Sequence, residues 1–404
     1  MIVYIDRTHI KNKRVLLRVD FNVPIRNNKS KDPEKLYEIL DDERIRSTLP
    51  TITKLLKDNK LIIISHLGRP NGWDEKLLLR PIAKRLQKYL PRNRITVIDD
   101  FISSGAKRHF DDQKNGEIIL LENIRFFKGE ESPESSEGKD LAEKLKNLGD
   151  VYVNDAFGVS HRECVSVTEL PKLLPHFGGL LLEREVETIG HVMKHAKRPM
   201  VAIIGGAKIS TKLKLLYKLT EKTDYLMLGG GIANTFLLSL GYEVGKSLVE
   251  SELLEDVKKI ENHAKLHGTN ILLPTDVIVG DKDNSNKAGV AKRIADISSD
   301  DSILDIGPET QAEYAKAILN SKTLIWNGPV GYAENPEYAR GTDFLYYVIT
   351  QNKDLFSIVG GGDTLAAIDK KEYLNKITHI STGGGAMLEY IEKGTLPGIE
   401  ALKI

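Results

Sequence analysis

Short apolar runs rich in β-branched residues recur along the chain and predict buried β-strands. We expect strands at residues 15–19, 61–64, 118–121, 151–153, 201–204, 226–228, 271–273, 323–326 and 357–359. Longer stretches between them carry apolar residues at helical spacing and predict helices over 50–58, 81–90, 141–148, 212–219 and 252–265. Strands that alternate with helices are typical of parallel sheets covered on both faces, so the pattern predicts an α/β fold.

The chain is too long for one ordinary domain. It has 404 residues, whereas single cores rarely grow beyond roughly 250 to 300 residues. Two glycines at 178 and 179 precede LLLEREVETIGHVMKHAKRP, which we interpret as one connecting helix ended by Pro199. We therefore predict domains over 1–179 and 200–395, joined by an interdomain helix or hinge over 180–199. The polar stretch 27–41 is expected to be a surface excursion.

Composition and charge exclude several classes of function. The hydrophobic share of 41% and the charged share of 28% are typical of a soluble globular protein, and no apolar run approaches transmembrane length. A net charge of +1 gives no general attraction to nucleic acid, so any anion recognition must be local. The N-terminus lacks a secretion signal, and Cys164 is the single cysteine, which excludes an internal disulfide. Both features predict a cytoplasmic protein.

Basic residues recur at or near the predicted strand ends of the first half, where open α/β sheets bind their ligands. These residues are Arg44, His66, Arg69, Arg125, His161 and Arg162. Because the planar fork of arginine matches carboxylate and phosphate, they predict a site for a compact polyanion. Taken singly, each arginine is more often a solvated charge or an ion-pair partner.

The first predicted strand continues into a segment with alternating side chains. Its apolar residues occupy one side, while Arg18, Asp20 and Asn22 occupy the other. Three polar groups at the end of a mostly buried strand favour a ligand site. A solvated sheet edge is the alternative interpretation.

Glycine-rich turns follow the predicted strands of the second half, in the sequences GGAK, GGGIANTF, GGGDT and STGGG. Glycine lets the backbone approach a ligand, and the following helix N-terminus presents N–H groups, so four such turns predict a phosphate cradle. Each one taken alone could instead serve tight packing between a strand and a helix. Lys208 and Lys212 are expected to emerge on one face at the start of a helix. Asp363 is the candidate magnesium ligand, with helix capping as its alternative role.

Motifs of other nucleotide-binding families are missing. GGAKIS does not match GxxxxGK[ST], no predicted strand is followed by GxGxxG, and HRE with DAFG does not form the protein-kinase pair. His191 and His195 lie four apart on the connecting helix without a carboxylate motif beside them. We therefore interpret these two as surface histidines rather than metal ligands.

A dozen motifs, in order from near residue 15 to residue 402, resemble those of phosphoglycerate kinases. They are RVLLRVDFNVP, DDERIRSTLPTI, SHLGRP, LLENIRF, VNDAFGVSHR, GGAKIS, GGGIANTFL, DIGPET, WNGPVGYAE, GGGDT, STGGGAMLE and LPGIEAL. The resemblance implies two doubly wound, Rossmann-like lobes that face a cleft and close about a hinge. It implies reversible, magnesium-dependent phosphoryl transfer between 1,3-bisphosphoglycerate and ADP, giving 3-phosphoglycerate and ATP in glycolysis. It also implies a monomer whose tail, residues 396–404, returns to the first lobe.

The resemblance assigns site residues motif by motif. For the phosphoglycerate it implies Asp20, Phe21, Asn22, Arg44, His66, Leu67, Gly68, Arg69, Arg125 and Arg162. For the nucleotide it implies Gly206, Ala207, Lys208, Lys212, Gly230, Gly307, Asn327, Pro329, Glu334, Gly361, Gly362, Asp363 and Thr364. Glu334 is expected to accept from the ribose hydroxyls and Asp363 to bind magnesium, while the expected catalytic groups are Arg44, Lys208, Gly362 and Gly384.

Two alternatives stay open beside this reading of the function. The chain could be a nucleotide-binding or scaffold protein that keeps the fold without the activity. It could also be another acyl-phosphate kinase with a different carboxylate substrate. Intact Arg44, Lys208, Lys212, Glu334 and Asp363 argue against the first alternative.

Overall fold

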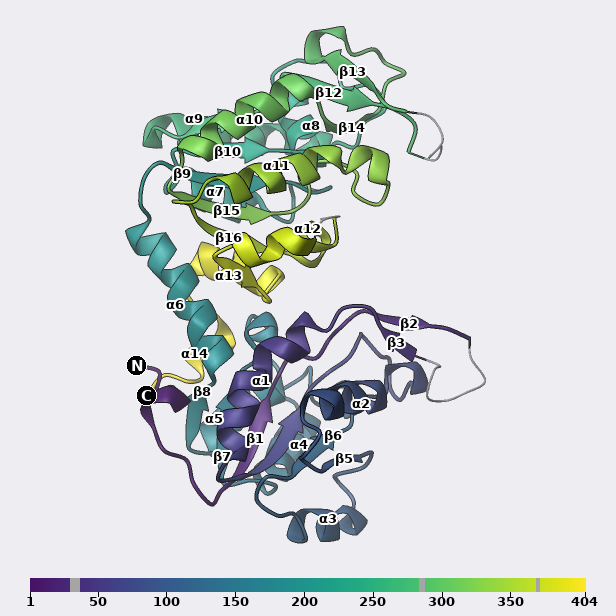
Figure 1. Cartoon of the computed structure of the whole chain (residues 1–404), viewed down its shortest axis with the longest axis vertical. Helices are drawn as coiled ribbons and strands as arrows, with labels where there is room; N and C mark the ends of the chain where they lie inside the picture. Colours follow the sequence, from purple (N-terminus) through teal and green to yellow (C-terminus); the bar gives the residue numbers. More distant parts are fainter. Residues whose placement is uncertain (30–36, 283–287, 368–370) are drawn as a thin grey trace. The chain divides into compact units, whose positions relative to one another are not determined.

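The chain folds into two compact units (Figure 1). The computed structural model describes residues 1–29, 37–282, 288–367 and 371–404. Unit 1 comprises Met1–Glu187 with Thr395–Ile404, and unit 2 comprises Thr188–Gly394. Helix α6 (Leu180–His195) begins in unit 1 and ends in unit 2, so the predicted connecting segment is helical over most of its length.

Unit 1 is built on a six-stranded parallel sheet with the order β5-β6-β4-β1-β7-β8. Its strands are β1 (Arg14–Arg18), β4 (Lys60–Ile64), β5 (Ile95–Ile98), β6 (Ile118–Leu121), β7 (Val151–Asn154) and β8 (His176–Gly178). β1 is central, because Val15 pairs with Leu61 of β4 and with Val151 of β7. The alternative of a solvated sheet edge is therefore wrong, and Arg18 is only 2% exposed.

Both faces of this sheet are covered. Leu16 and Leu17 point to opposite faces, and each is fully buried. The helices of unit 1 are α1 (Glu43–Leu56), α2 (Arg80–Tyr89), α3 (Lys107–Asp111), α4 (Ser136–Lys146), α5 (Leu170–Leu173) and α14 (Pro397–Glu400). α1 begins earlier than the prediction of a start at residue 50, because buried Ile45 and Thr48 extend the apolar stripe upstream of Pro50.

The polar stretch 27–41, predicted as a surface excursion, is entered and left through a pair of strands. β2 (Ile25–Asn27) and β3 (Tyr37–Ile39) run antiparallel to each other. Residues 30–36 of the excursion lie outside the described residues. The two described ends of the excursion are therefore held together by antiparallel strand pairing.

The C-terminal segment Thr395–Ile404 belongs to unit 1 rather than to the unit that precedes it in the chain. The N–H of Gly398 donates to the carbonyl of Ser160 at 2.8 Å, and Ile2 forms an antiparallel bridge with Lys403. A Cβ on Gly398 would stand 2.6 Å from the side chain of Val167, so this contact requires glycine. Both chain ends are thus anchored on unit 1.

Unit 2 repeats the architecture with a six-stranded parallel sheet, β11-β10-β9-β15-β16-β17, and adds a small antiparallel sheet, β13-β12-β14. The strands are β9 (Met200–Ile204), β10 (Tyr225–Leu228), β11 (Asn270–Leu272), β12 (Asp276–Val279), β13 (Val290–Arg293), β14 (Ile303–Ile306), β15 (Thr323–Asn327), β16 (Phe356–Gly360) and β17 (His379–Ser381). The helices are α7 (Leu213–Thr220), α8 (Gly230–Ser239), α9 (Leu254–His267), α10 (Pro308–Asn320), α11 (Arg340–Gln351), α12 (Gly362–Ala366) and α13 (Gly385–Lys393). The predicted α/β class with two parallel sheets is confirmed.

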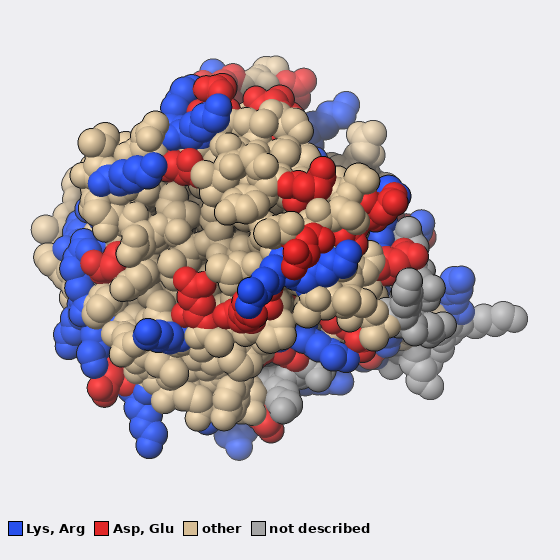
Figure 2. Space-filling view, turned by 90° about the horizontal axis from the view of Figure 1, so that it is seen from above, with Lys and Arg blue, Asp and Glu red and all other residues tan. Residues whose placement is uncertain are grey.

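The surface carries charges of both signs. Figure 2 shows one face, on which Lys and Arg are interspersed with Asp and Glu around broad areas of other residues. No helix in the described part of the chain has the length and hydropathy needed to span a membrane. On the face shown, basic side chains do not form a continuous stripe.

Candidate active site

The predicted substrate residues of unit 1 follow four neighbouring strands, β6, β4, β1 and β7. Parallel strands end at the same edge of a sheet, so the residues after them are brought together. Asp20, Phe21 and Asn22 follow β1; His66, Leu67, Gly68 and Arg69 follow β4; Arg125 lies in the turn Ile124–Phe126 after β6; Arg162 follows the turn Phe157–Val159 after β7; Arg44 lies in the first turn of α1.

Arg44 is held by a buried carboxylate. Its guanidinium donates to Oδ2 of Asp20, while Oδ1 of Asp20 accepts from the N–H of Asn22 at 3.1 Å. Burial raises the pKa of Asp20, but the charge of Arg44 and the hydrogen bond from the Asn22 N–H outweigh it, and the net pKa lies below its usual range. Asp20 is therefore an anion that fixes one edge of the Arg44 fork.

The turn after β4 is fixed by side chains from two other strand ends. The N–H of Gly68 donates to Oδ1 of Asn22 at 2.8 Å, and Nη1 of Arg125 donates to the Gly68 carbonyl at 2.5 Å. The N–H of Leu67 donates to Asn123 at 3.2 Å. Gly68 has φ +64°, a conformation that favours glycine. Three strand ends are thus tied into one rigid rim.

His66 lies under this rim as a neutral group. It is 2% exposed, and its Nδ1 lies 3.4 Å from Nη2 of Arg18. Burial lowers the pKa of His66 well below its usual range. The charge of Asp20 raises this pKa, and the nearby arginines lower it. Near pH 7 it offers hydrogen bonds rather than a positive charge. The backbone of Phe21 is fixed nearby, since its N–H donates to Ser65 Oγ at 3.0 Å.

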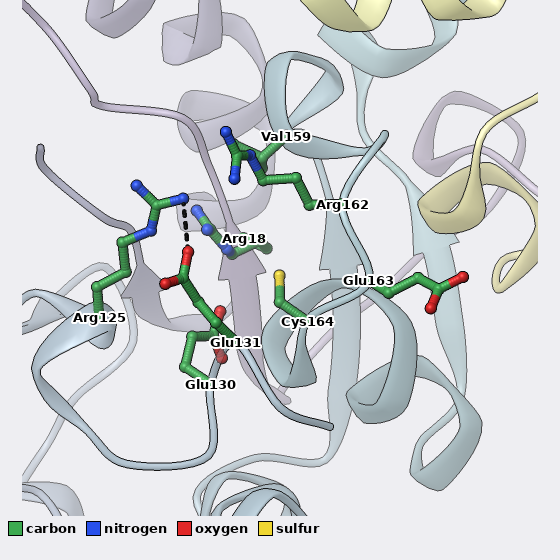
Figure 3. A pocket seen from close by; sticks show the side chains of 8 residues that line it. All are labelled: Arg18, Arg125, Glu130, Glu131, Val159, Arg162, Glu163 and Cys164. Atoms are coloured by element: carbon green, nitrogen blue, oxygen red, sulfur yellow. Dashed lines mark ion pairs between the residues drawn. The ribbon is translucent and has the colours of Figure 1, made fainter. Parts of the chain in front are cut away.

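A cavity of about 260 Å³ opens among the arginines (Figure 3). It is lined by Arg18, Arg125, Glu130, Glu131, Val159, Arg162, Glu163 and Cys164. Figure 3 shows the guanidinium groups of Arg18, Arg125 and Arg162 gathered around one side of it, with Glu131 paired to Arg125 at 3.0 Å. Burial lowers the pKa of Arg125. The positive charges of Arg162 and Arg18 lower it further, whereas the negative charge of Glu131 raises it. A bound anion would relieve this crowding of positive charge.

The cavity also contains Arg18, which the alternation along its strand marks as a candidate, and Glu130, which no sequence motif assigns to a site. Nε of Arg18 donates to Ser166 Oγ at 2.8 Å, and Ser166 Oγ donates to Glu130 at 2.5 Å. Arg18 lies on the polar side of its predicted strand. Because both faces of a parallel sheet are covered by helices, the position of this strand in such a sheet indicates that the Arg18 side chain is buried. Arg69, in contrast, is exposed, and within the described residues its side chain has no hydrogen bond or ion pair.

The predicted nucleotide residues of unit 2 lie in turns after six strands. Gly206, Ala207 and Lys208 follow β9; Gly230 follows β10; Gly307 follows β14; Asn327 ends β15 and Pro329 follows it; Gly361, Gly362, Asp363 and Thr364 follow β16; Gly384 follows β17; Glu334 lies before the turn Pro336–Tyr338. β14 belongs to the antiparallel sheet, so Gly307 comes from a different layer than the others. The remaining turns share one edge of the parallel sheet.

Some of these glycines serve packing between turns. A Cβ on Gly205 would lie 2.0 Å from the Pro329 carbonyl oxygen, and one on Gly230 would lie 2.8 Å from the carbonyl oxygen of Gly206. The packing alternative therefore holds at these positions. Gly362 and Gly384 differ, because a Cβ on either of them would meet nothing within 4 Å. These two glycines border open space and can admit a ligand.

Lys212 bridges two of the turns. Its ammonium donates to the Gly205 carbonyl at 2.7 Å and to Asn327 Oδ1 at 2.9 Å, which leaves its third N–H for a ligand. Burial lowers the pKa of Lys212 to about 8, against the opposing charge of Asp363. The prediction that Lys208 and Lys212 share a helix face is wrong, because α7 begins at Leu213 and Lys208 lies in the preceding turn.

Asn327 and Thr364 connect the turn after β16 to its neighbours. Nδ2 of Asn327 donates to the Gly360 carbonyl at 2.8 Å, and Thr364 Oγ1 accepts from the N–H of Gly328 at 2.7 Å. Asp363 and Glu334 are exposed and accessible to a ligand. In the described part of the chain, no group of three or more His, Cys, Asp or Glu side chains is arranged to hold a metal. A magnesium ion here would need oxygen ligands from the nucleotide.

The N-terminus of α10 is already occupied by the chain itself. Asp276 accepts from the N–H groups of Glu309 at 3.0 Å and Thr310 at 2.7 Å. A Cβ on Gly307 would lie 2.3 Å from the same carboxylate. Gly307 thus lets Asp276 cap α10, and the N–H groups of Glu309 and Thr310 are not available to a phosphate.

Comparison with known proteins gives one consistent result. A profile of the family described as phosphoglycerate kinase matches residues 5–394. The chain is 43% identical to a phosphoglycerate kinase of Dictyoglomus turgidum over 98% of this chain and 96% of the relative. It is 41% identical to that of Thermosynechococcus vestitus, over 99% and 98% of the two chains.

Solved structures agree with the sequence relatives. The phosphoglycerate kinase of Coxiella burnetii superposes with a TM-score of 0.85 at 37% identity and covers 100% of this chain and 99% of its own. That of Pyrococcus horikoshii gives a TM-score of 0.82 at 29% identity, with 99% and 98% covered. The similarity therefore extends over both units.

Proposed function

Because this chain belongs to the phosphoglycerate kinase family, we propose that unit 1 binds the phosphoglycerate and unit 2 binds the adenine nucleotide. The chain is a phosphotransferase of glycolysis, and the family reaction moves a phosphoryl group reversibly between 1,3-bisphosphoglycerate and ADP. Two observations carry the assignment to unit 1: the set of three guanidinium groups around one cavity, and Arg44 held by ionised Asp20. Three guanidinium groups on one side of the cavity suit the anionic groups of a small substrate.

The chemistry needs positioning more than proton transfer. The attacking groups, a carboxylate in one direction and a phosphate oxygen in the other, are already anionic, so no general base is required. We assign the stabilisation of the transferring phosphoryl group to Arg44, Lys208 and the N–H groups beside Gly362 and Gly384. Neutral His66 then orients the substrate by hydrogen bonds instead of adding charge.

The nucleotide site is assigned from the open glycines and the bridging lysine. Lys212 presents its remaining N–H beside the turn that carries Asp363, and Glu334 is accessible to the ribose hydroxyls. Exposed Asp363 fits a magnesium ion that is shared with nucleotide phosphates and water. When bound, such an ion would neutralise charge on the phosphates. Asp363 itself would hold the ion in place and draw the Lys212 ammonium toward the same phosphates.

The role of Arg44 is tested by Arg44→Ala. Loss of one preorganised donor is expected to lower kcat by about 10²- to 10³-fold. Arg46→Ala is the matched control, because Arg46 lies on the same helix but is exposed and pairs with Asp42 and Glu43. A folded Arg44→Ala protein with nearly normal kcat would show that Arg44 has no catalytic role.

One assay separates this function from its alternatives. The protein is supplied with ATP, magnesium and 3-phosphoglycerate, and the products are analysed for ADP and an acid-labile acyl phosphate. A phosphoglycerate kinase forms both products. A scaffold protein forms neither, and a kinase for another carboxylate is active only when that acid replaces 3-phosphoglycerate.

Transfer requires the two bound ligands to come within reach of each other with water excluded, so we include domain closure in the proposal. Solution scattering with both ligands is expected to show compaction of the particle. The proposal also includes a cytoplasmic monomer, and sedimentation of the purified protein tests the oligomeric state. Unchanged scattering together with normal turnover would contradict closure.

A further inference from the structure

Helices α7 and α9 pack against each other on unit 2 and end at the same edge of the sheet. α7 ends at Thr220 shortly before β10 begins, and α9 ends at His267 shortly before β11 begins. Both helix ends therefore lie where the strands start. The glycine-rich turns leave from the opposite ends of the strands, so this region is separate from the candidate nucleotide site.

Two histidines lie one turn apart at the end of α9. His263 and His267 are four residues apart and share a helix face. Their ring centroids are 4.3 Å apart with an interplanar angle of 37°. His263 is half-buried against the ring of Tyr217 of α7, at 5.3 Å between centroids, whereas His267 is exposed. The two rings are thus paired, and one of them is anchored by a neighbouring helix.

Hydrogen bonds fix which ring nitrogen carries the proton. Nδ1 of His267 lies 2.9 Å from the carbonyl oxygen of His263, which can only accept, so this Nδ1 is the donor. Nδ1 of His263 lies 2.8 Å from Thr220 Oγ1, whose single hydrogen is directed to the Tyr217 carbonyl at 2.7 Å. The His263 Nδ1 therefore donates as well. In the neutral rings, the lone pair of each histidine is left on Nε2.

The surroundings favour a positive ion. The C-terminal ends of helices carry a partial negative charge, and two of them meet here. Glu221 follows α7 and is paired with Lys218 at 2.8 Å. The hydrogen bond from Lys218 lowers the pKa of Glu221 against the burial that raises it, so Glu221 is ionised near neutral pH. An ionised carboxylate thus lies close to both imidazoles.

We propose that His263 and His267 form a surface site for a transition-metal ion such as Zn²⁺ or Ni²⁺, bound through the two Nε2 atoms. Imidazole suits these ions, whereas Mg²⁺ prefers oxygen. Metal-binding histidines usually donate their other ring N–H to an oxygen, which is the arrangement both rings have here. Since no third His, Cys, Asp or Glu in the described residues completes a ligand set, water fills the remaining positions.

The chain contains its own control pair. His191 and His195 of α6 are also four residues apart, but their ring centroids are 5.4 Å apart and both side chains are exposed. Within the described residues, neither ring nitrogen of this pair has a hydrogen bond that would hold the ring. Binding an ion there would require ordering two exposed side chains that no hydrogen bond holds, so we assign the site to His263 and His267.

The test is a calorimetric titration of the full chain with ZnCl₂ in a non-coordinating buffer at pH 7.5, without nucleotide. We expect one ion per chain, and at least tenfold weaker binding in His267→Asn. His195→Asn is expected to bind like the wild type. Because His267 is exposed, its replacement should leave the circular dichroism spectrum and kinase activity unchanged. Thr220→Val, which removes the partner of His263, should weaken binding about tenfold.

The proposal would be overturned by equal zinc affinity in the wild type and His267→Asn. It would equally be overturned by loss of binding in His195→Asn alone, or by no binding at millimolar zinc. A second measurement is independent of calorimetry. Because an ion that binds only the folded chain raises its unfolding temperature, zinc should stabilise the wild type and His195→Asn but not His267→Asn.

Discussion

Asp155 holds the first turn of the helix that leads out of unit 1, and its removal gives the sharpest test of the fold. The N–H groups of Leu181 and Leu182 donate to Asp155 Oδ1 at 2.9 and 3.1 Å, and the N–H of Leu180 donates to Thr51 at 3.0 Å. The first three N–H groups of α6 are therefore satisfied by side chains. Replacing Asp155 with Ala leaves two of them without an acceptor.

The cost follows from these contacts. Loss of a helix N-cap destabilises a protein by about 0.5–2 kcal/mol, and an unsatisfied buried donor costs about 1–3 kcal/mol. Asp155→Ala should therefore lower the free energy of unfolding by about 2–4 kcal/mol. Asp155→Asn keeps the accepting oxygen and should cost less than about 1 kcal/mol. The difference between the two variants isolates the hydrogen bonds from the volume of the side chain.

The charge on Asp155 adds a pH dependence that separates the variants further. Burial raises the pKa of Asp155 to about 7, against the N–H groups that lower it. Between about pH 4 and 7 the folded chain holds a proton that the unfolded chain releases. The contribution of Asp155 to the free energy of unfolding therefore falls as pH rises from about 4 to 7, by at most about 1.4 kcal/mol per pH unit. Above about pH 7 this contribution no longer changes with pH. Asp155→Asn removes this component of the slope.

Urea unfolding of the wild type and both variants at pH 5.5 and pH 8 measures these effects. At pH 5.5 Asp155 is mostly neutral, so the comparison reports the hydrogen bonds. Asp305, whose pKa burial also raises to about 7, keeps its contribution in all three proteins and cancels in the differences. An Asp155→Ala protein within about 0.5 kcal/mol of the wild type at pH 5.5 would refute the capping argument.

Three further predictions test neighbouring contacts. Gly179→Ala would place a Cβ 2.2 Å from Asp155 Oδ1 and should destabilise the chain by more than about 2 kcal/mol in the same urea assay. Lys212→Gln should raise KM for ATP about tenfold or more, with little change in KM for 3-phosphoglycerate. In the wild type the pKa of Lys212 is lowered to about 8, so activity that depends on the charge of Lys212 should fall as pH rises through 8. Ser166→Ala removes the acceptor of Arg18 and should cost about 1–3 kcal/mol and raise KM for 3-phosphoglycerate, measured by urea unfolding and steady-state kinetics.

The inner strands of the parallel sheets can be predicted from sequence because they are buried on both faces and form unbroken apolar runs, whereas the edge strands β5, β8 and β17 are not predicted. The predicted bounds of β6 are the observed ones, and those of β4 and β9 agree within one residue. β13 escapes prediction, because its sequence VAKR is largely exposed and gives no apolar signal. The start of α1 is misplaced because Pro50 favours a first turn, whereas the apolar stripe before it extends the helix.

The site residues are predictable as a set, but their interactions are not. Strand ends identify which residues meet, since parallel strands end at one edge of the sheet. The partners are set by three-dimensional contacts between distant segments, as for Arg18 with Ser166 and Lys212 with Asn327. Helical spacing predicts Lys208 and Lys212 on one helix face, and the later start of α7 separates them.

The two candidate sites differ in what a single substitution disturbs. In unit 1 the ligand would meet long side chains, so truncating Arg162 removes one contact while the turns around it stay tied by other residues. In unit 2 the turns touch each other through backbone, since a Cβ on Gly205 or Gly328 would lie within 2.0 or 2.3 Å of a carbonyl oxygen of the other turn. A change there displaces two turns at once. Truncating Arg125 or Arg162 at the cavity of unit 1 should therefore act mainly on substrate affinity, while glycine substitutions in unit 2 should lower stability and nucleotide affinity together.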